Sequence, residues 1–150
     1  AWDLMKKIIP FMLATRDGEK IRSRPMAAYV RPEEGTIYFL TDARRHKDEE
    51  IERDHHVNLG FADAGAQKYV SVSGTARVSN DRGKIRELFG TEAKAWWDNP
   101  DDPNIRVLKV TPDEAEYWDS PGTIVSYVKM VVAAATGGRP DIGENRMVAI

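Results

Sequence analysis

The stretch KIRSRPMAAYV, residues 20–30, decides how the fold is interpreted. Its composition is typical of a β-strand, but Lys20, Arg22 and Arg24 recur at every second position. Alternate side chains of a strand point to the same face, so three cations share one face and predict an anionic partner. Pro25 interrupts the stretch and removes one ladder donor. It therefore marks a place where the backbone can contact something other than a neighbouring strand.

Strand-like segments continue on both sides of this stretch. Asp17-Gly18 separates it from the apolar residues before it and is a strong hairpin signal. More strands are predicted at residues 36–41, 57–64, 69–79 and 105–119, the last bent at Pro112. Six strands with short turns and few helices predict a mainly β protein, a closed or nearly closed antiparallel barrel. Small barrels leave little interior space, so a ligand is expected on the outer wall or between subunits.

Three helices are predicted between and after the strands, at residues 42–54, 80–98 and 120–136. Asp42 is the expected N-cap of the first helix. The tail after residue 138 has no clear period.

Composition limits the class of protein. The 150 residues fit a single domain, residues 1–150, with a formal charge of −2 and no cysteine. No apolar run is long enough for a membrane helix, and neither nucleic acid nor membrane is expected as a partner. A cytoplasmic location is expected from the absence of cysteine. Apolar surface on the helix of residues 120–136 and on a strand face bearing Val70 and Val72 predicts a homodimer.

Basic and hydroxyl side chains gather where the third strand ends and the next helix starts. A helix N-terminus suits a phosphate, and these side chains would complete an anion cradle: Arg22, Arg24, Thr41, Arg44, Arg45 and Lys47. The structural alternative is that the arginines are solvated charges on an edge strand and a helix face.

Four segments in order, SRPM, YFLTDARRHK, YVSVSGTARV and AEYWDSP, resemble the pyridoxamine 5′-phosphate oxidase-like flavoproteins, most closely the bacterial general stress protein branch. The resemblance covers residues 8–135 and implies a split β-barrel homodimer of six strands that binds FMN in a cleft between subunits. The flavin contacts that it implies are Arg22, Ser23, Arg24, Pro25, Met26, Leu40, Thr41, His46, Lys47 and, often from the second subunit, Trp118.

The chain departs from the true oxidases at two places. Their arginine- and histidine-rich terminal segment is replaced by SYVKMVVAAATGGRPDIGENRMVAI. Their flavin-contacting glutamine has no counterpart, since the spacing from Gln67 to Gly74 does not match. Oxidation of pyridoxamine phosphate is therefore not expected.

The resulting hypothesis is an FMN-dependent oxidoreductase with a stress-related role, in which no side chain stands out as an essential acid or base. The alternatives are a non-enzymatic flavin carrier or sensor, and a reductase that uses a deazaflavin. An RNA-binding barrel is disfavoured by the net charge. No metal site is predicted: His55 and His56 are adjacent and lack the spacing of a ligand pair on a helix. Trp96 and Trp97 are expected to cover a barrel end or a dimer contact.

Overall fold

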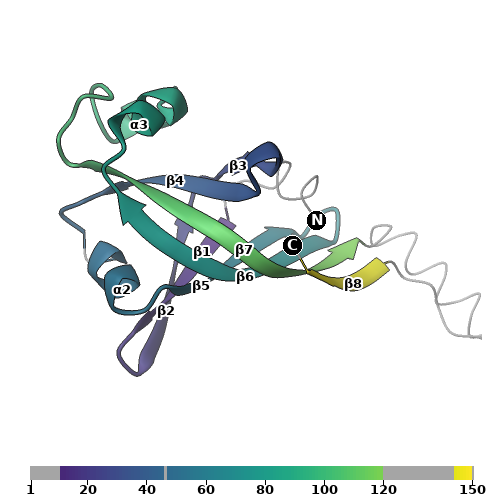
Figure 1. Ribbon diagram of the computed structural model, residues 1–150. Coiled ribbons are helices and arrows are strands. Elements are labelled where there is room, and N and C mark those ends of the chain that lie inside the picture. Colours follow the sequence, from purple (N-terminus) through teal and green to yellow (C-terminus); the bar gives the residue numbers. More distant parts are fainter. Residues whose placement is uncertain (1–10, 46, 120–143, 150) are drawn as a thin grey trace, which may run out of the picture.

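The computed structural model describes residues 11–45, 47–119 and 144–149, and its strands form one antiparallel sheet (Figure 1). The strands are β1 (Phe11–Asp17), β2 (Lys20–Met26), β3 (Tyr29–Arg31), β4 (Thr36–Asp42), β5 (His56–Asp63), β6 (Lys68–Ser79), β7 (Ile105–Asp119) and β8 (Glu144–Ala149). Their order is β2-β1-β5-β6-β7-β4-β3, and β8 pairs with β7. The mainly β antiparallel fold is thus confirmed, with eight strands in the described part of the chain where the sequence predicted six.

The stacking of phenylalanines shows that the sheet curls into a barrel. Phe11 of β1 stacks on Phe39 of β4 with ring centroids 4.8 Å apart, and on Phe61 of β5 at 4.9 Å. Three strands separate β1 from β4 in the sheet order. Neighbouring strands are spaced by about 4.8 Å, so a flat sheet would hold β1 and β4 roughly 19 Å apart. The direct ring contact therefore requires a closed, barrel-like curvature.

The barrel interior holds the main hydrophobic core, to which six strands and one helix contribute side chains. Val70 and Val72 of β6 belong to this core and are buried, as alternation along β6 requires. The prediction that these two valines offer a face to a second subunit is therefore wrong, because the barrel itself covers them.

A second core lies against the other face of β4. It is covered by α3 (Arg82–Leu88) and the short 3₁₀ helix η2 (Ala93–Ala95). This explains why residues Thr36 to Thr41 of β4 are buried on both faces. The prediction of one helix over residues 80–98 is wrong: Asp81 caps α3 at Lys84 N, 3.1 Å away, and α3 ends before Phe89.

The helix predicted over residues 42–54 is shorter than expected. The described helix is α2 (Lys47–Arg53), and Asp42 is the last residue of β4, opposite Ile105 of β7. Asp42 is not the N-cap, because pairing with β7 carries the strand one residue past Thr41.

The stretch predicted as one strand, residues 20–30, is divided into β2 and β3. β2 pairs with β1, whereas β3 pairs with β4, with Tyr29 opposite Tyr38. These two strands are the two ends of the sheet order. Ala27 and Ala28 therefore carry the chain from one edge of the barrel to the other, and η1 (Pro32–Glu34) then forms the predicted turn into β4.

Other predictions are settled at single positions. The Asp17-Gly18 hairpin is confirmed, with Gly18 at φ 60° and Asp17 opposite Lys20. The bend at Pro112 is confirmed as a register shift between β6 and β7. The predicted helix over residues 120–136 lies outside the described residues. Within the described residues, no helix is long and apolar enough to span a membrane.

Candidate functional site

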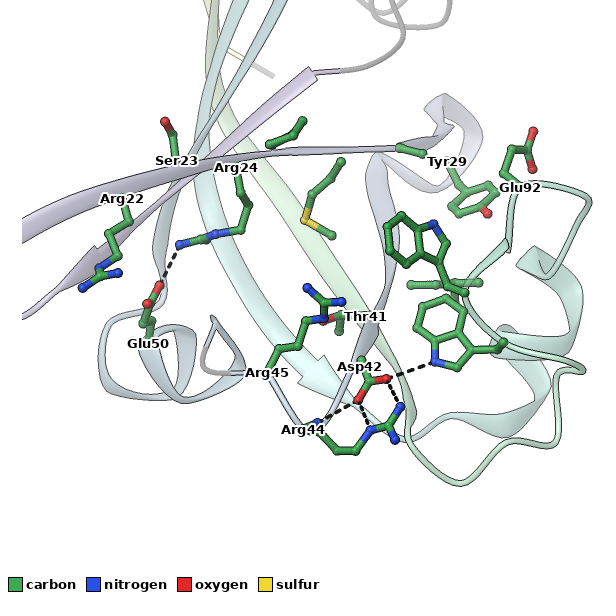
Figure 2. A pocket seen from close by; sticks show the side chains of 16 residues that line it. Arg22, Ser23, Arg24, Tyr29, Thr41, Asp42, Arg44, Arg45, Glu50 and Glu92 are labelled. Atoms are coloured by element: carbon green, nitrogen blue, oxygen red, sulfur yellow. Dashed lines mark hydrogen bonds and ion pairs between the residues drawn. The ribbon is translucent and has the colours of Figure 1, made fainter. Parts of the chain in front are cut away.

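A cleft of about 880 Å³ opens beside the connection from β2 to β3. One wall is β2, the floor is the end of β4, and the other wall is the loop around η2 (Figure 2). The lining residues are Arg22, Ser23, Arg24, Pro25, Met26, Ala27, Tyr29, Leu40, Thr41, Asp42, Arg44, Arg45, Glu50, Glu92, Trp96 and Trp97.

The structure brings most of the site residues predicted from the sequence to this cleft. The seven that line it are Arg22, Ser23, Arg24, Pro25, Met26, Leu40 and Thr41. His46 and the side chain of Lys47 lie outside the described residues. Trp118 does not line the cleft: it is half-buried near the end of β7, between Tyr69 of β6 and Asn145 of β8.

The edge of β2 that borders the cleft is free of strand partners in the described part of the chain. β2 pairs with β1 alone, so only half of its backbone groups enter the ladder. Pairs that exchange hydrogen bonds alternate along β1 and β2 with pairs that do not. Pro25 has no N–H, so its pair with Met12 is of the second kind, and the two-residue turn after Asp17 gives the same alternation. By this pattern the backbone N–H of Ser23 points to the free edge, where Pro25 has no N–H to leave unpaired. β2 therefore offers the cleft a row of backbone donors and acceptors.

Two arginines of β2 have carboxylate partners. Arg24 donates from Nη2 to Glu50 Oε2 at 2.9 Å and from Nη1 to Thr15 Oγ1 at 2.8 Å. Glu50 is buried on α2, so this pair joins β2, β1 and α2 beneath the cleft. Arg22 pairs through Nε with Asp17 Oδ2 at 2.8 Å, but more than half of its side chain is exposed. Exposed pairs contribute little and exchange readily, so Arg22 is the more available of the two cations.

Asp42 joins the floor of the cleft to the η2 loop. Its carboxylate accepts hydrogen bonds from Arg44 Nη2 at 2.6 Å and from Trp97 Nε1 at 3.3 Å. The hydrogen bond from the Arg44 guanidinium holds the pKa of the Asp42 carboxyl well below its ordinary value. Asp42 is therefore an anion at neutral pH. It holds the indole of Trp97 by a hydrogen bond and neutralises the charge of Arg44.

Arg45 differs from the other cleft arginines. Its Cζ lies 5.8 Å from the centroid of the Trp96 ring, and no described carboxylate pairs with it. Arg22, Arg24 and Arg44 each have such a partner. Among the described arginines of the cleft, Arg45 is thus the one whose charge no described carboxylate neutralises.

The far end of the cleft holds Tyr29 and Glu92, away from Arg22 and Glu50 (Figure 2). Burial raises the pKa of the Tyr29 hydroxyl, and the charge of Glu92 raises it further. Tyr29 is therefore a neutral phenol at physiological pH. The cleft is basic in its middle and aromatic at this end.

The cleft combines arginines, the free edge of β2 and aromatic side chains. This combination supports binding of a planar, anionic molecule. Asp42 and Glu50 are both held by arginines. No group of three or more metal-ligating side chains occurs among the described residues, and His55 and His56 are exposed.

Sequence reasoning missed the wall formed by the η2 loop. Glu92, Trp96 and Trp97 of this loop line the cleft, as does Tyr29 of β3, although none of the four was predicted as a site residue. The adjacent tryptophans were the available signal, since one residue of such a pair is easily left exposed when the other is buried.

The chain matches the family model described as "Pyridoxamine 5'-phosphate oxidase like" over residues 1–141. It is 30% identical over 141 residues to Protein bli-3 of Neurospora crassa, which covers 86% of this chain and 68% of that protein.

Two solved structures are also similar. The structure called general stress protein 26 from Jannaschia sp. CCS1 has a TM-score of 0.79 and 26% identity, covering 99% of this chain and 94% of that one. The general stress FMN/FAD binding protein of Xanthomonas citri has a TM-score of 0.69 and 26% identity, covering 78% and 84%. With the family match over residues 1–141 and the barrel geometry, these similarities show that the chain belongs to the pyridoxamine 5′-phosphate oxidase-like family, with general stress proteins among its structural neighbours.

Proposed function

We propose that this chain binds FMN in the cleft along β2 and acts as a flavin-dependent oxidoreductase with a stress-related role, as a cytoplasmic homodimer. One observation carries the proposal: seven residues predicted as flavin contacts line one cleft together with an arginine that has no described carboxylate partner. A similar structure, from Xanthomonas citri, is that of an FMN/FAD binding protein, which supports a flavin as the ligand.

The cleft suits a flavin in size and in polarity. Its volume of about 880 Å³ is in the upper part of the range for ligand sites. The free edge of β2 presents backbone donors and acceptors in a line, as the polar edge of a planar heterocycle requires. Met26 and Leu40 supply apolar contact beside that edge.

The cations of the cleft suit the phosphate. Arg45 has no described carboxylate partner, and the Arg22 pair with Asp17 is exposed enough to be exchanged for a phosphate. Lys47 is the third expected contact, from the sequence. A bound flavin would supply the redox chemistry, and the chain would supply binding, orientation and neutralisation of the phosphate charge.

The test compares FMN with riboflavin, which lacks the phosphate. Hydrogen bonds to charged groups contribute about 1.5–3 kcal/mol, so Lys47→Met and Arg22→Ala are each expected to weaken FMN roughly tenfold or more. Riboflavin should bind poorly and respond little to either change. Arg86→Gln is the matched control, because Arg86 is an exposed arginine that does not line the cleft. Equal losses for riboflavin and FMN would remove both residues from the phosphate site.

A homodimer is expected to complete the site with Trp118 of the second subunit. Trp118 is half-buried on the outer side of β7 and does not line the cleft of its own chain. A sedimentation mass of 16.9 kDa at micromolar concentration would contradict the dimer.

A non-enzymatic flavin carrier is the second candidate. It is favoured by the ion pairs of Asp42 and Glu50, because two of the three carboxylates that line the cleft are thereby held from accepting a proton from a substrate. Steady-state oxidation of NADH or NADPH by the flavin-loaded protein separates the candidates, because a carrier produces no turnover.

A further inference from the structure

Trp96 is an exposed aromatic side chain at the rim of the cleft. Its side chain is 70% exposed, whereas the neighbouring Trp97 is 8% exposed. The turn at η2 explains the difference: Ala93 and Trp97 are buried in the core beside β4, so the intervening side chain turns outward. Large exposed aromatics beside a cleft are a common feature of ligand and partner contacts.

The position of Trp96 is fixed by its neighbours. Its backbone N–H donates to Ala93 O at 3.0 Å, and the Trp97 N–H donates to the same oxygen at 3.0 Å. Trp97 Nε1 also donates to Asp42 at the end of β4. The backbone that carries Trp96 is therefore held in a short, anchored turn, so a ligand that stacks on the indole needs little ordering of the backbone.

Arg45 and Trp96 form a combined polar and aromatic feature. Arg45 Cζ lies over one face of the Trp96 ring at 5.8 Å, which is within the range of a cation–π contact. An indole has two faces, and the exposure of Trp96 leaves the other face open. Arg45 keeps its charge available because no described carboxylate pairs with it. Glu92, on the same side of the cleft as Tyr29, adds a hydrogen-bond acceptor (Figure 2).

We propose that Trp96 and Arg45 form a subsite for an adenylate group at the rim of the flavin cleft. The adenine ring stacks on the open face of Trp96, its amino group lies toward Glu92, and the phosphate lies beside Arg45. Stacking of a base on an aromatic side chain and charge pairing with a phosphate are the two contacts that such a group requires. This inference rests on the proposed flavin site, to which the subsite is continuous through Arg45.

Two kinds of ligand carry an adenylate group that fits this subsite. One is FAD, whose adenylate would occupy the subsite while its flavin occupies the cleft. The other is a separate dinucleotide, such as a nicotinamide donor, bound beside FMN. The experiment has one arm for each source.

The first arm titrates the full chain, stripped of flavin, with FMN and with FAD by calorimetry. Trp96→Ala is expected to weaken FAD about tenfold and FMN less than twofold, while Trp96→Phe keeps most of the FAD affinity. Ile21→Ala is the control, because Ile21 is exposed at the β1–β2 hairpin and does not line the cleft. Arg45→Gln should weaken both flavins, whereas Arg86→Gln should weaken neither.

The second arm titrates the FMN-loaded protein with 5′-AMP. A lower affinity for FAD relative to FMN in Trp96→Ala supports the subsite with FAD as its source. An unchanged ratio of these affinities, with AMP binding that Trp96→Ala abolishes, supports the subsite with a separate dinucleotide as its source.

The proposal is overturned if Trp96→Ala does not lower the affinity for FAD relative to FMN and AMP either fails to bind or binds Trp96→Ala equally well. It is also overturned if Trp96→Ala dissociates a dimer and leaves both nucleotide affinities unchanged. A wild-type protein that binds FMN but shows either pattern leaves the flavin site standing. A wild-type protein that binds neither flavin refutes the flavin site itself.

Discussion

Removing the Arg24 guanidinium should destabilise the protein more than removing the charge of its partner Glu50. The Glu50 side chain is 8% exposed and the Arg24 side chain is 23% exposed. Arg24→Met leaves a buried carboxylate whose remaining side-chain hydrogen-bond partner, among the described residues, is the hydroxyl of Thr15. Breaking a buried pair in this way costs about 3–5 kcal/mol, and the partial exposure of Arg24 places the expected loss near the lower end, at about 3 kcal/mol.

The reverse change is expected to cost less. Glu50→Gln leaves the charge on Arg24, which has more access to water, and the amide still accepts hydrogen bonds. We expect a loss of about 1–2 kcal/mol. The double variant Arg24→Met with Glu50→Leu removes both charges and should recover part of the stability lost by Arg24→Met alone.

The assay is urea unfolding of each variant without added flavin, so that ligand binding does not contribute. The control is Arg22→Met, which removes the exposed pair with Asp17 and should cost less than about 1 kcal/mol. The reasoning is refuted if Glu50→Gln is more destabilising than Arg24→Met, or if Arg24→Met costs no more than the control.

Three further predictions concern other parts of the molecule. Because the pKa of Asp42 is depressed in the folded protein, the stability that the Asp42 carboxylate contributes is fully present above the ordinary Asp pKa of about 4 and is lost as the pH falls below it. The difference in unfolding free energy between wild type and Asp42→Asn, measured by urea unfolding, should therefore shrink below about pH 4. Gly74→Ala should cost about 1–3 kcal/mol of stability in thermal unfolding, because a Cβ there would collide with the carbonyl oxygen of Thr111. Gly60→Ala is the control and should be nearly neutral, because the nearest atom to its Cβ would be 4.0 Å away. Similar losses for both variants would contradict the close approach of Gly74 to Thr111. Trp118→Leu should keep the fold and the dimer but brighten bound flavin and weaken its binding severalfold; an unfolded variant or unchanged emission would make Trp118 a packing residue.

The strands could be predicted because their signals are local. Alternation in residues 69–79 and the glycine turn after Asp17 specify the sheet without knowledge of distant contacts. β8 and the end of β4 could not be predicted in this way. β8 forms where Glu144–Ala149 meets β7, and Asp42 joins β4 because Ile105 lies opposite. In both cases tertiary pairing decides the local structure.

The candidate site was predictable on the β2 wall and at the β4 floor, but not on the wall formed by the η2 loop. The β2 residues lie together in sequence, so a motif can indicate them as a group. The η2 wall reaches the cleft through burial of Trp97 and its hydrogen bond to Asp42, 55 residues away in the chain. The partner of Arg24 was also hidden, since Glu50 lies on a helix 26 residues further on. Such contacts depend on how the barrel closes.

The most direct test of the flavin site is the visible absorption spectrum of the full chain after incubation with excess FMN and removal of unbound ligand. The mass of the molecule released on denaturation is measured on the protein as purified, before FMN is added. The proposed function predicts the two-band spectrum of an oxidised flavin, in proportion to protein, and the release of FMN or FAD. A colourless protein after this treatment, or the release of a deazaflavin from the protein as purified, would contradict it.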